Sequence, residues 1–124
     1  MTDKLINSKE YFIAYSIMIK AAQQHGFATY QEIALAMGWP LVGNQMGKLV
    51  GDLIGTISEN EIAQGRPMLS VIVVGVDGKP GEGLYSWAKK LKVMEEDEDE
   101  EAFWHKECEK VYSEWKQTYP YKKK

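Results

Sequence analysis

Apolar side chains recur at helical spacing in the first third of the chain and predict two helices. The first helix is expected between a capping pair, Asn7 with Glu10, and Gly26. The second is expected to open at the capping box formed by Thr29 and Glu32 and to end at Gly38. Two helices separated by a short extended connection are the first part of the predicted fold.

Glycine recurs at every fourth position of the next helical segment, which is predicted from about Gly43 to Ile57. The four positions are Gly43, Gly47, Gly51 and Gly55. Glycine costs about 1 kcal/mol relative to alanine inside a helix, so the stripe indicates a close approach along one helical edge. Three partners fit that edge: the first helix or wing of the same fold, DNA, or another protein. The apolar side of this helix, which is expected to face the core, carries Met46, Leu49, Val50 and Leu53.

The segment after this helix is expected to be a loop followed by a strand. Residues 58–66 are polar, and the run MLSVIVV at 68–74 is the most strand-like in the chain. Glycine and proline predict a loop over 75–83, and the pattern of 84–91 predicts a short helix. This order of elements predicts an α+β, winged-helix-like domain over 1–93.

An acidic segment, 94–101, is predicted to connect this domain to a C-terminal amphipathic helix and basic tail within 102–124. Seven consecutive acidic residues favour a solvated linker or a helix start. The apolar seam of the helix consists of Trp104, Cys108, Val111 and Trp115 at 4-3-4 spacing. The seam packs either on its own domain or on a partner, and in the second alternative Trp104, Val111 and Trp115 are the partner-binding residues.

Composition indicates one soluble domain whose two parts differ in charge. The chain has 124 residues and a formal net charge of −3. Residues 1–93 carry nine Lys/Arg and eight Asp/Glu, whereas residues 94–124 carry six and ten. The body is therefore nearly neutral and lacks the dominant basic patch that is typical of nucleic-acid-binding proteins.

The sequence predicts a cytoplasmic protein without a cofactor, a metal site or a membrane segment. The single cysteine, Cys108, excludes an internal disulfide, and two histidines are too few to suggest a metal centre. No apolar stretch approaches the roughly 20 residues that span a bilayer, and the N-terminus lacks a signal-peptide pattern.

Two stretches, FATYQEIALAMG at 27–38 and NQMGKLVGDLI at 44–54, resemble the DNA-binding half of the alkylguanine-DNA alkyltransferases and of the catalytically inactive alkyltransferase-like proteins. In that family the pattern TYGE[IL]A starts a helix, and a recognition helix carrying RAVG enters the minor groove. The positions of this chain that match are Thr29, Tyr30, Glu32, Ile33, Ala34 and Gly47. The resemblance covers roughly residues 26–85 and implies a winged-helix fold that binds double-stranded DNA.

The resemblance also implies roles for single residues. Tyr30 matches the tyrosine that helps turn a nucleotide out of the duplex, whereas Asn44 stands where the family has an intercalating arginine and is too short to fill that space. The family motif PCHRV falls on 67–71 and puts Met68 at the nucleophilic cysteine and Leu69 at the histidine. Alkyl transfer needs a thiolate beside a base, so these residues exclude it.

The sequence therefore predicts a non-enzymatic DNA-binding protein. In this prediction Asn44, Gln45 and Lys48 face the groove, Tyr30 presses on the backbone, and Lys79 contacts phosphate from the wing. The alternative is a protein-interaction or regulatory module, for example of a phage or defence system, which acts through the aromatic tail helix and acidic run on a protein partner or a second copy. The glycine-rich loop 75–83 lacks the GK[ST] ending of phosphate-binding loops and is predicted to be a turn.

Overall fold

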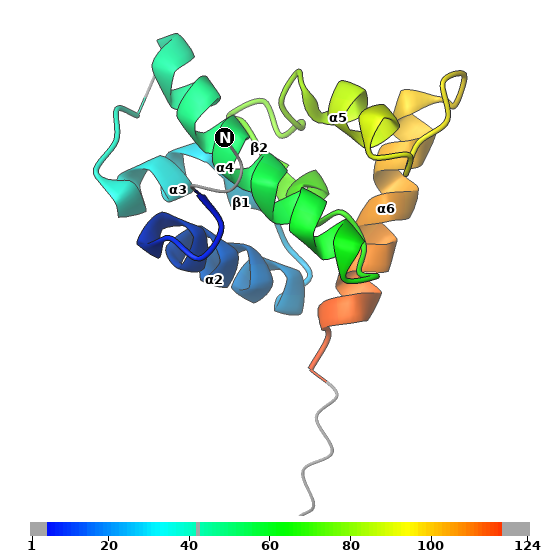
Figure 1. The fold of residues 1–124 in the computed structure, drawn as a ribbon, viewed down its shortest axis with the longest axis horizontal. Helices are drawn as coiled ribbons and strands as arrows, with labels where there is room; N and C mark the ends of the chain where they lie inside the picture. Colours follow the sequence, from blue (N-terminus) through cyan, green and yellow to red (C-terminus); the bar gives the residue numbers. More distant parts are fainter. Residues whose placement is uncertain (1–4, 42, 118–124) are drawn as a thin grey trace, which may run out of the picture.

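The computed structural model describes residues 5–41 and 43–117 and shows a mostly helical α+β fold around a very small parallel sheet (Figure 1). The elements in chain order are α2 (Lys9–Gln23), β1 (Ala28–Thr29), α3 (Tyr30–Met37), α4 (Gly43–Ala63), the 3₁₀ helix η1 (Leu69–Ile72), β2 (Val73–Val74), α5 (Leu84–Lys90) and α6 (Glu100–Trp115). The long helix α4 crosses the molecule, with α2 and α3 on one side and α5 and α6 on the other (Figure 1).

The helix starts follow local capping chemistry, with one difference from the prediction. The cap of α2 is Ser8, whose hydroxyl accepts a hydrogen bond from the Tyr11 amide at 3.1 Å. Asn7 lies one residue earlier at a φ of 67°, so the predicted Asn7 cap is wrong by one position. The capping box of α3 is confirmed, because Thr29 and Glu32 accept hydrogen bonds from each other's amides.

Helix α4 is longer than predicted, and the loop expected over 58–66 is wrong. The helix continues to Ala63 because its polar side chains find partners inside the protein. Ser58 is fully buried and donates from its hydroxyl to the Ser70 hydroxyl at 2.7 Å. Glu61 is also fully buried and pairs with the Arg66 guanidinium. A polar sequence can thus form a buried helical turn when its groups are satisfied.

The strand predicted over 68–74 is also wrong for most of its length. Residues 69–72 form the 3₁₀ helix η1, and only Val73–Val74 pair, in parallel, with Ala28–Thr29. Because the Thr29 capping box starts α3 at once, the partner strand has only two residues. All residues of 68–74 are nevertheless buried, so the apolar run marks the core correctly but not its backbone conformation.

The C-terminal helix α6 packs into the same hydrophobic core. Asp99 caps it by accepting a hydrogen bond from the Ala102 amide at 2.9 Å, so the helix begins within the acidic run. Phe103 and Val111 are fully buried, and α6 contacts both α2 and η1. The short helix predicted over 84–91 is confirmed as α5.

Candidate nucleic-acid interface

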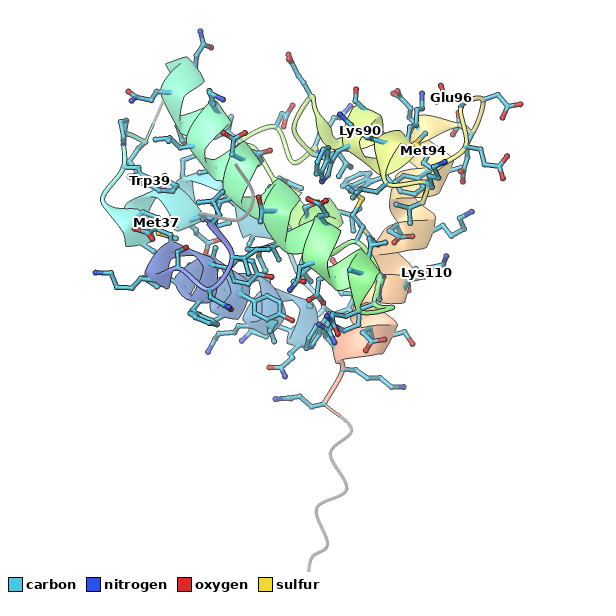
Figure 2. The ribbon with its side chains drawn as sticks, in the orientation of Figure 1. Met37, Trp39, Lys90, Met94, Glu96 and Lys110 are labelled. Carbon is cyan, nitrogen blue, oxygen red and sulfur yellow. The ribbon has the colours of Figure 1, made fainter. Side chains whose placement is uncertain are left out.

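Helices α3 and α4 follow one another along the chain, and local hydrogen bonds end α3. Gly38 ends α3 in the left-handed conformation, at a φ of 76°, and the Trp39 amide donates to the Ala34 carbonyl at 2.9 Å. Figure 2 shows Met37 and Trp39 together at this end of the molecule, far from Met94 near the start of α6.

The first half of α4 displays the polar side chains that the sequence assigned to DNA. Asn44, Gln45 and Lys48 are all exposed. The Lys48 ammonium lies 3.2 Å from the Asp52 carboxylate, and both side chains are more than half exposed, at 77% and 60%. An exposed pair of this kind contributes about 0 to 1 kcal/mol, so Lys48 can exchange Asp52 for another anion at little cost.

The glycine edge of α4, which consists of Gly43, Gly47, Gly51 and Gly55, divides into a covered end and a bare stretch. At Gly55 an added Cβ would lie 3.5 Å from the indole nitrogen of Trp87 in α5, and that nitrogen donates to the Gly55 carbonyl at 2.9 Å. At Gly47 and Gly51 an added Cβ would meet no atom of the described residues within 4 Å. The close approach expected along the whole edge is therefore present in the fold only at Gly55.

Tyr30 contacts the segment after β2 instead of projecting into solvent. It is the first residue of α3, it is half-buried, and its hydroxyl lies against Gly81 so closely that a Cβ there would overlap it. Burial raises the pKa of the Tyr30 hydroxyl above its ordinary value. In this structure Tyr30 therefore joins the start of α3 to the end of the 75–80 hairpin.

The 75–80 hairpin is a compact turn that presents Lys79. The Gly75 amide donates to the Lys79 carbonyl at 2.9 Å, and Val74 bridges to Pro80. The Asp77 carboxylate accepts from the Lys79 amide at 3.0 Å. Gly78 has a φ of 75°, a conformation that favours glycine. Lys79 is exposed, as the prediction requires, and it is carried on a hydrogen-bonded turn.

The segment matched to the alkyltransferase active site lies inside the core. Met68 and Leu69 are fully buried, and the Met68 amide donates to the buried Glu107 carboxylate at 2.9 Å. Cys108 is buried as well, with its sulfur 3.7 Å from the Val71 carbonyl oxygen. Burial, followed by the charges of two neighbouring glutamates, raises the pKa of the Cys108 thiol to about 12. Cys108 therefore stays protonated at neutral pH and is a poor nucleophile.

The three residues assigned to a partner contact lie between α6 and the rest of the domain. Val111 is fully buried. The Trp104 indole donates to the Val71 carbonyl at 2.8 Å. Trp115 packs edge-on against Tyr15, with ring centroids 6.1 Å apart, and the Arg66 guanidinium lies 5.9 Å from its ring. Val111 therefore offers no surface to a partner, whereas Trp104 and Trp115 contact the domain but stay half-buried.

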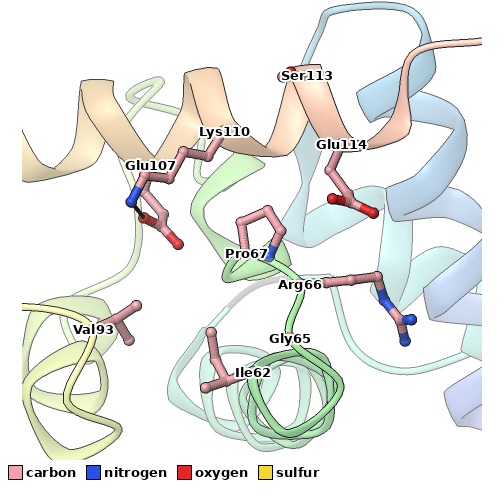
Figure 3. A pocket seen from close by; sticks show the side chains of 9 residues that line it. All are labelled: Ile62, Gly65, Arg66, Pro67, Val93, Glu107, Lys110, Ser113 and Glu114. Atoms are coloured by element: carbon pink, nitrogen blue, oxygen red, sulfur yellow. Dashed lines mark ion pairs between the residues drawn. The ribbon is translucent and has the colours of Figure 1, made fainter.

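Sequence patterns missed a buried polar cluster beside α6. Glu61 accepts two hydrogen bonds from Arg66, at 2.7 and 3.0 Å, and one from the Tyr15 hydroxyl at 2.7 Å. A groove of about 610 Å³ lies beside this cluster. Its lining includes Arg66, Pro67 and the Glu107–Lys110 ion pair, whose side chains are drawn in Figure 3. The only sequence signal was a glutamate and an arginine at polar positions next to an apolar run.

Comparison with known proteins identifies no relative that would indicate a function, so the functional proposal rests on the sequence and the structure. No family model matches the chain, and comparisons with curated proteins and with solved structures find no significant match. Within the part of the chain that the structure describes, no three His, Cys, Asp or Glu side chains are grouped to hold a metal ion. Of the described helices, none is long and apolar enough to cross a membrane.

Proposed function

We propose that this chain is a non-enzymatic protein that binds double-stranded DNA through the first half of α4. In this proposal α3 and α4 act as a helix-turn-helix, α4 is the recognition helix, and the 75–80 hairpin is the wing of a winged helix. Asn44, Gln45 and Lys48 contact the groove, and Lys79 contacts phosphate. Tyr30 acts mainly by holding the hairpin at the start of α3, and it meets the DNA backbone only at its exposed edge.

The observation that supports this proposal best is the bare stretch of the glycine edge. Each glycine inside a helix costs about 1 kcal/mol relative to alanine. At Gly55 the fold uses the missing side chain, because the Trp87 indole packs there. At Gly47 and Gly51 no described residue occupies the space. Packing within the described residues therefore does not offset the helix-propensity cost of Gly47 and Gly51. This favours a role in which a binding partner approaches the helix backbone closely at these two positions.

Charge predicts weak but salt-sensitive binding. Lys48 and Lys79 are the two cations of the proposed face, and the chain is acidic overall. Two phosphate contacts would give a slope of about −2 in a plot of log binding constant against log salt concentration. The resemblance to the alkyltransferase-like proteins adds support for the minor groove, with Asn44 offering hydrogen bonds where the family has an arginine.

The test is fluorescence anisotropy with a labelled duplex of about two helical turns, first at low salt and then at rising salt. We expect saturable binding with the slope given above, and Gly51→Leu should weaken it more than tenfold by filling the bare edge. Lys106→Gln is the control, because Lys106 pairs with Glu98 in the α6 region at 3.0 Å. Absence of saturable binding at low salt would contradict the proposal.

A further inference from the structure

Phe27 and Trp104 form an ordered aromatic pair on elements outside the proposed DNA-binding face. Phe27 precedes β1, and Trp104 lies in the first half of α6. Their ring centroids are 6.0 Å apart and their planes are inclined by 28°, which is an offset stack. Phe27 is 49% exposed and Trp104 is half-buried, so the stack is open to solvent. The Trp104 hydrogen bond to the Val71 carbonyl fixes the orientation of the indole.

The exposed side chains on the N-terminal side of Trp104, on the same helical face, are acidic. Neighbours three and four positions away lie on the same side of a helix, and here the two preceding ones are Glu100 and Glu101, both exposed. Glu101 also approaches the exposed His105 imidazole at 3.8 Å. Lys106 is two positions away, on a different side, and pairs with Glu98. The surface beside Trp104 therefore combines two exposed carboxylates with the solvent-exposed parts of the aromatic pair, and the His105 ring lies 5.3 Å from the Trp104 ring.

We propose that Phe27, Trp104, Glu100 and Glu101 form a docking surface for a basic segment of a partner protein. An arginine or lysine of the segment packs on the aromatic faces, where cation–π attraction contributes about 0.5 to 2 kcal/mol. The two carboxylates pair with its neighbouring cations. Nucleobases also stack on exposed aromatic rings. However, the carboxylates would repel the attached phosphates, so the local charge favours a cationic polypeptide. This surface is independent of the proposed DNA-binding function.

The experiment measures binding of an acetylated octapeptide of alternating arginine and glycine by isothermal titration calorimetry at low salt. The full chain is compared with Phe27→Ala and Phe12→Ala. Phe12 is a matched control, because it is a phenylalanine of similar exposure, 55%, that lies on α2 and does not belong to the Phe27–Trp104 stack. We expect saturable 1:1 binding that Phe27→Ala weakens about tenfold, a loss within the cation–π range. Phe12→Ala should leave the affinity unchanged.

Further variants separate the aromatic contribution from general attraction to an acidic protein. The double variant Glu100→Gln, Glu101→Gln should weaken peptide binding about tenfold and reduce its salt dependence. Circular dichroism and the unfolding midpoint verify that each variant is folded. Three outcomes would overturn the proposal: no saturable binding, an equal loss in Phe12→Ala, or single-stranded oligothymidylate binding that Phe27→Ala abolishes. The last outcome would assign the surface to nucleic acid.

Discussion

In the first half of α4, residues 43–52, only Val50 is buried, whereas in the second half, residues 53–63, six side chains are buried, two of them serine and glutamate. The same contrast holds for the ion pairs, because Lys48–Asp52 is exposed and Glu61–Arg66 has a fully buried carboxylate. It holds for the glycines too, since Gly51 is bare and Gly55 faces Trp87. The second half anchors the helix in the core, and this anchoring lets the first half carry residues that contribute little to stability.

The largest expected difference concerns the two ion pairs. Arg66→Ala leaves the Glu61 carboxylate buried with only the Tyr15 hydroxyl as a donor, so we expect it to lower the free energy of unfolding by about 3 kcal/mol. Lys48→Ala should change it by less than about 0.5 kcal/mol. Urea denaturation of both variants measures this difference. Equal losses would show that the two halves of α4 contribute alike to stability.

The second comparison places the same bulky side chain at two glycines. Gly55→Leu forces the Trp87 ring away and breaks its hydrogen bond to the Gly55 carbonyl, so we expect a loss of about 2 kcal/mol. Gly51→Leu enters open space and should not destabilise the protein. The unfolding midpoints of the two variants give the result. A destabilised Gly51→Leu would mean that the bare stretch is occupied in solution.

Alanine at the bare positions should stabilise the protein and weaken its binding to DNA. Gly47→Ala and Gly51→Ala each add helix propensity, worth about 0.8 kcal/mol, without a contact in the described residues. In the proposed complex the same methyl groups stand between the helix and DNA, so affinity should fall. Thermal denaturation measures the expected gain in stability, and fluorescence anisotropy on the same samples measures the expected loss of DNA affinity. If the DNA affinity is unchanged, Gly47 and Gly51 do not lie in the interface with DNA.

A smaller loss than those of Arg66→Ala and Gly55→Leu is expected from Tyr15→Phe, which removes one of three hydrogen bonds to Glu61 and should cost about 0.5 to 1 kcal/mol at neutral pH. Burial, followed by the hydrogen bond to Glu61, raises the pKa of Tyr15 above its ordinary value of 10.0. The folded state thus holds this proton more tightly than the unfolded state. Its contribution is complete below pH 10 and is lost as the pH rises further.

This loss can be followed by urea denaturation at several alkaline pH values. The free energy of unfolding of the wild type should decline above pH 10, and that of Tyr15→Phe should decline less steeply. Lys48→Ala serves as the control from the first half of α4 and should keep the wild-type slope. Parallel curves for all three proteins would contradict the assigned role of Tyr15.

The sequence predicted best what depends on neighbouring residues. The capping box at Thr29 and the left-handed Gly38 involve residues within a few positions, and both are present. The errors at 58–66 and 68–74 have non-local causes. Ser58 stays helical because it bonds Ser70, and the strand is short because its partner strand β1 has only two residues. The pattern of apolar and polar residues along the chain reveals neither the Ser58–Ser70 hydrogen bond nor the length of the partner strand.

The candidate site shows the same limit. Exposure of Asn44, Gln45 and Lys48 follows from helical periodicity, and these residues are indeed exposed. The contact of Tyr30 with Gly81 joins distant parts of the chain and could not be predicted from spacing. The division of the glycine edge is another such case, because only the position of Trp87 in space distinguishes Gly55 from Gly51.

The two-residue sheet has a consequence for folding kinetics. It joins Ala28 to Val73, which lie 45 positions apart, and thereby brings the hairpin beside the start of α3. Helices α3 and α4 form through local contacts, whereas this pairing must first close a long loop at an entropic cost. We therefore expect α3 and the first half of α4 to form early in folding and the hairpin to reach α3 only when the distant strands meet.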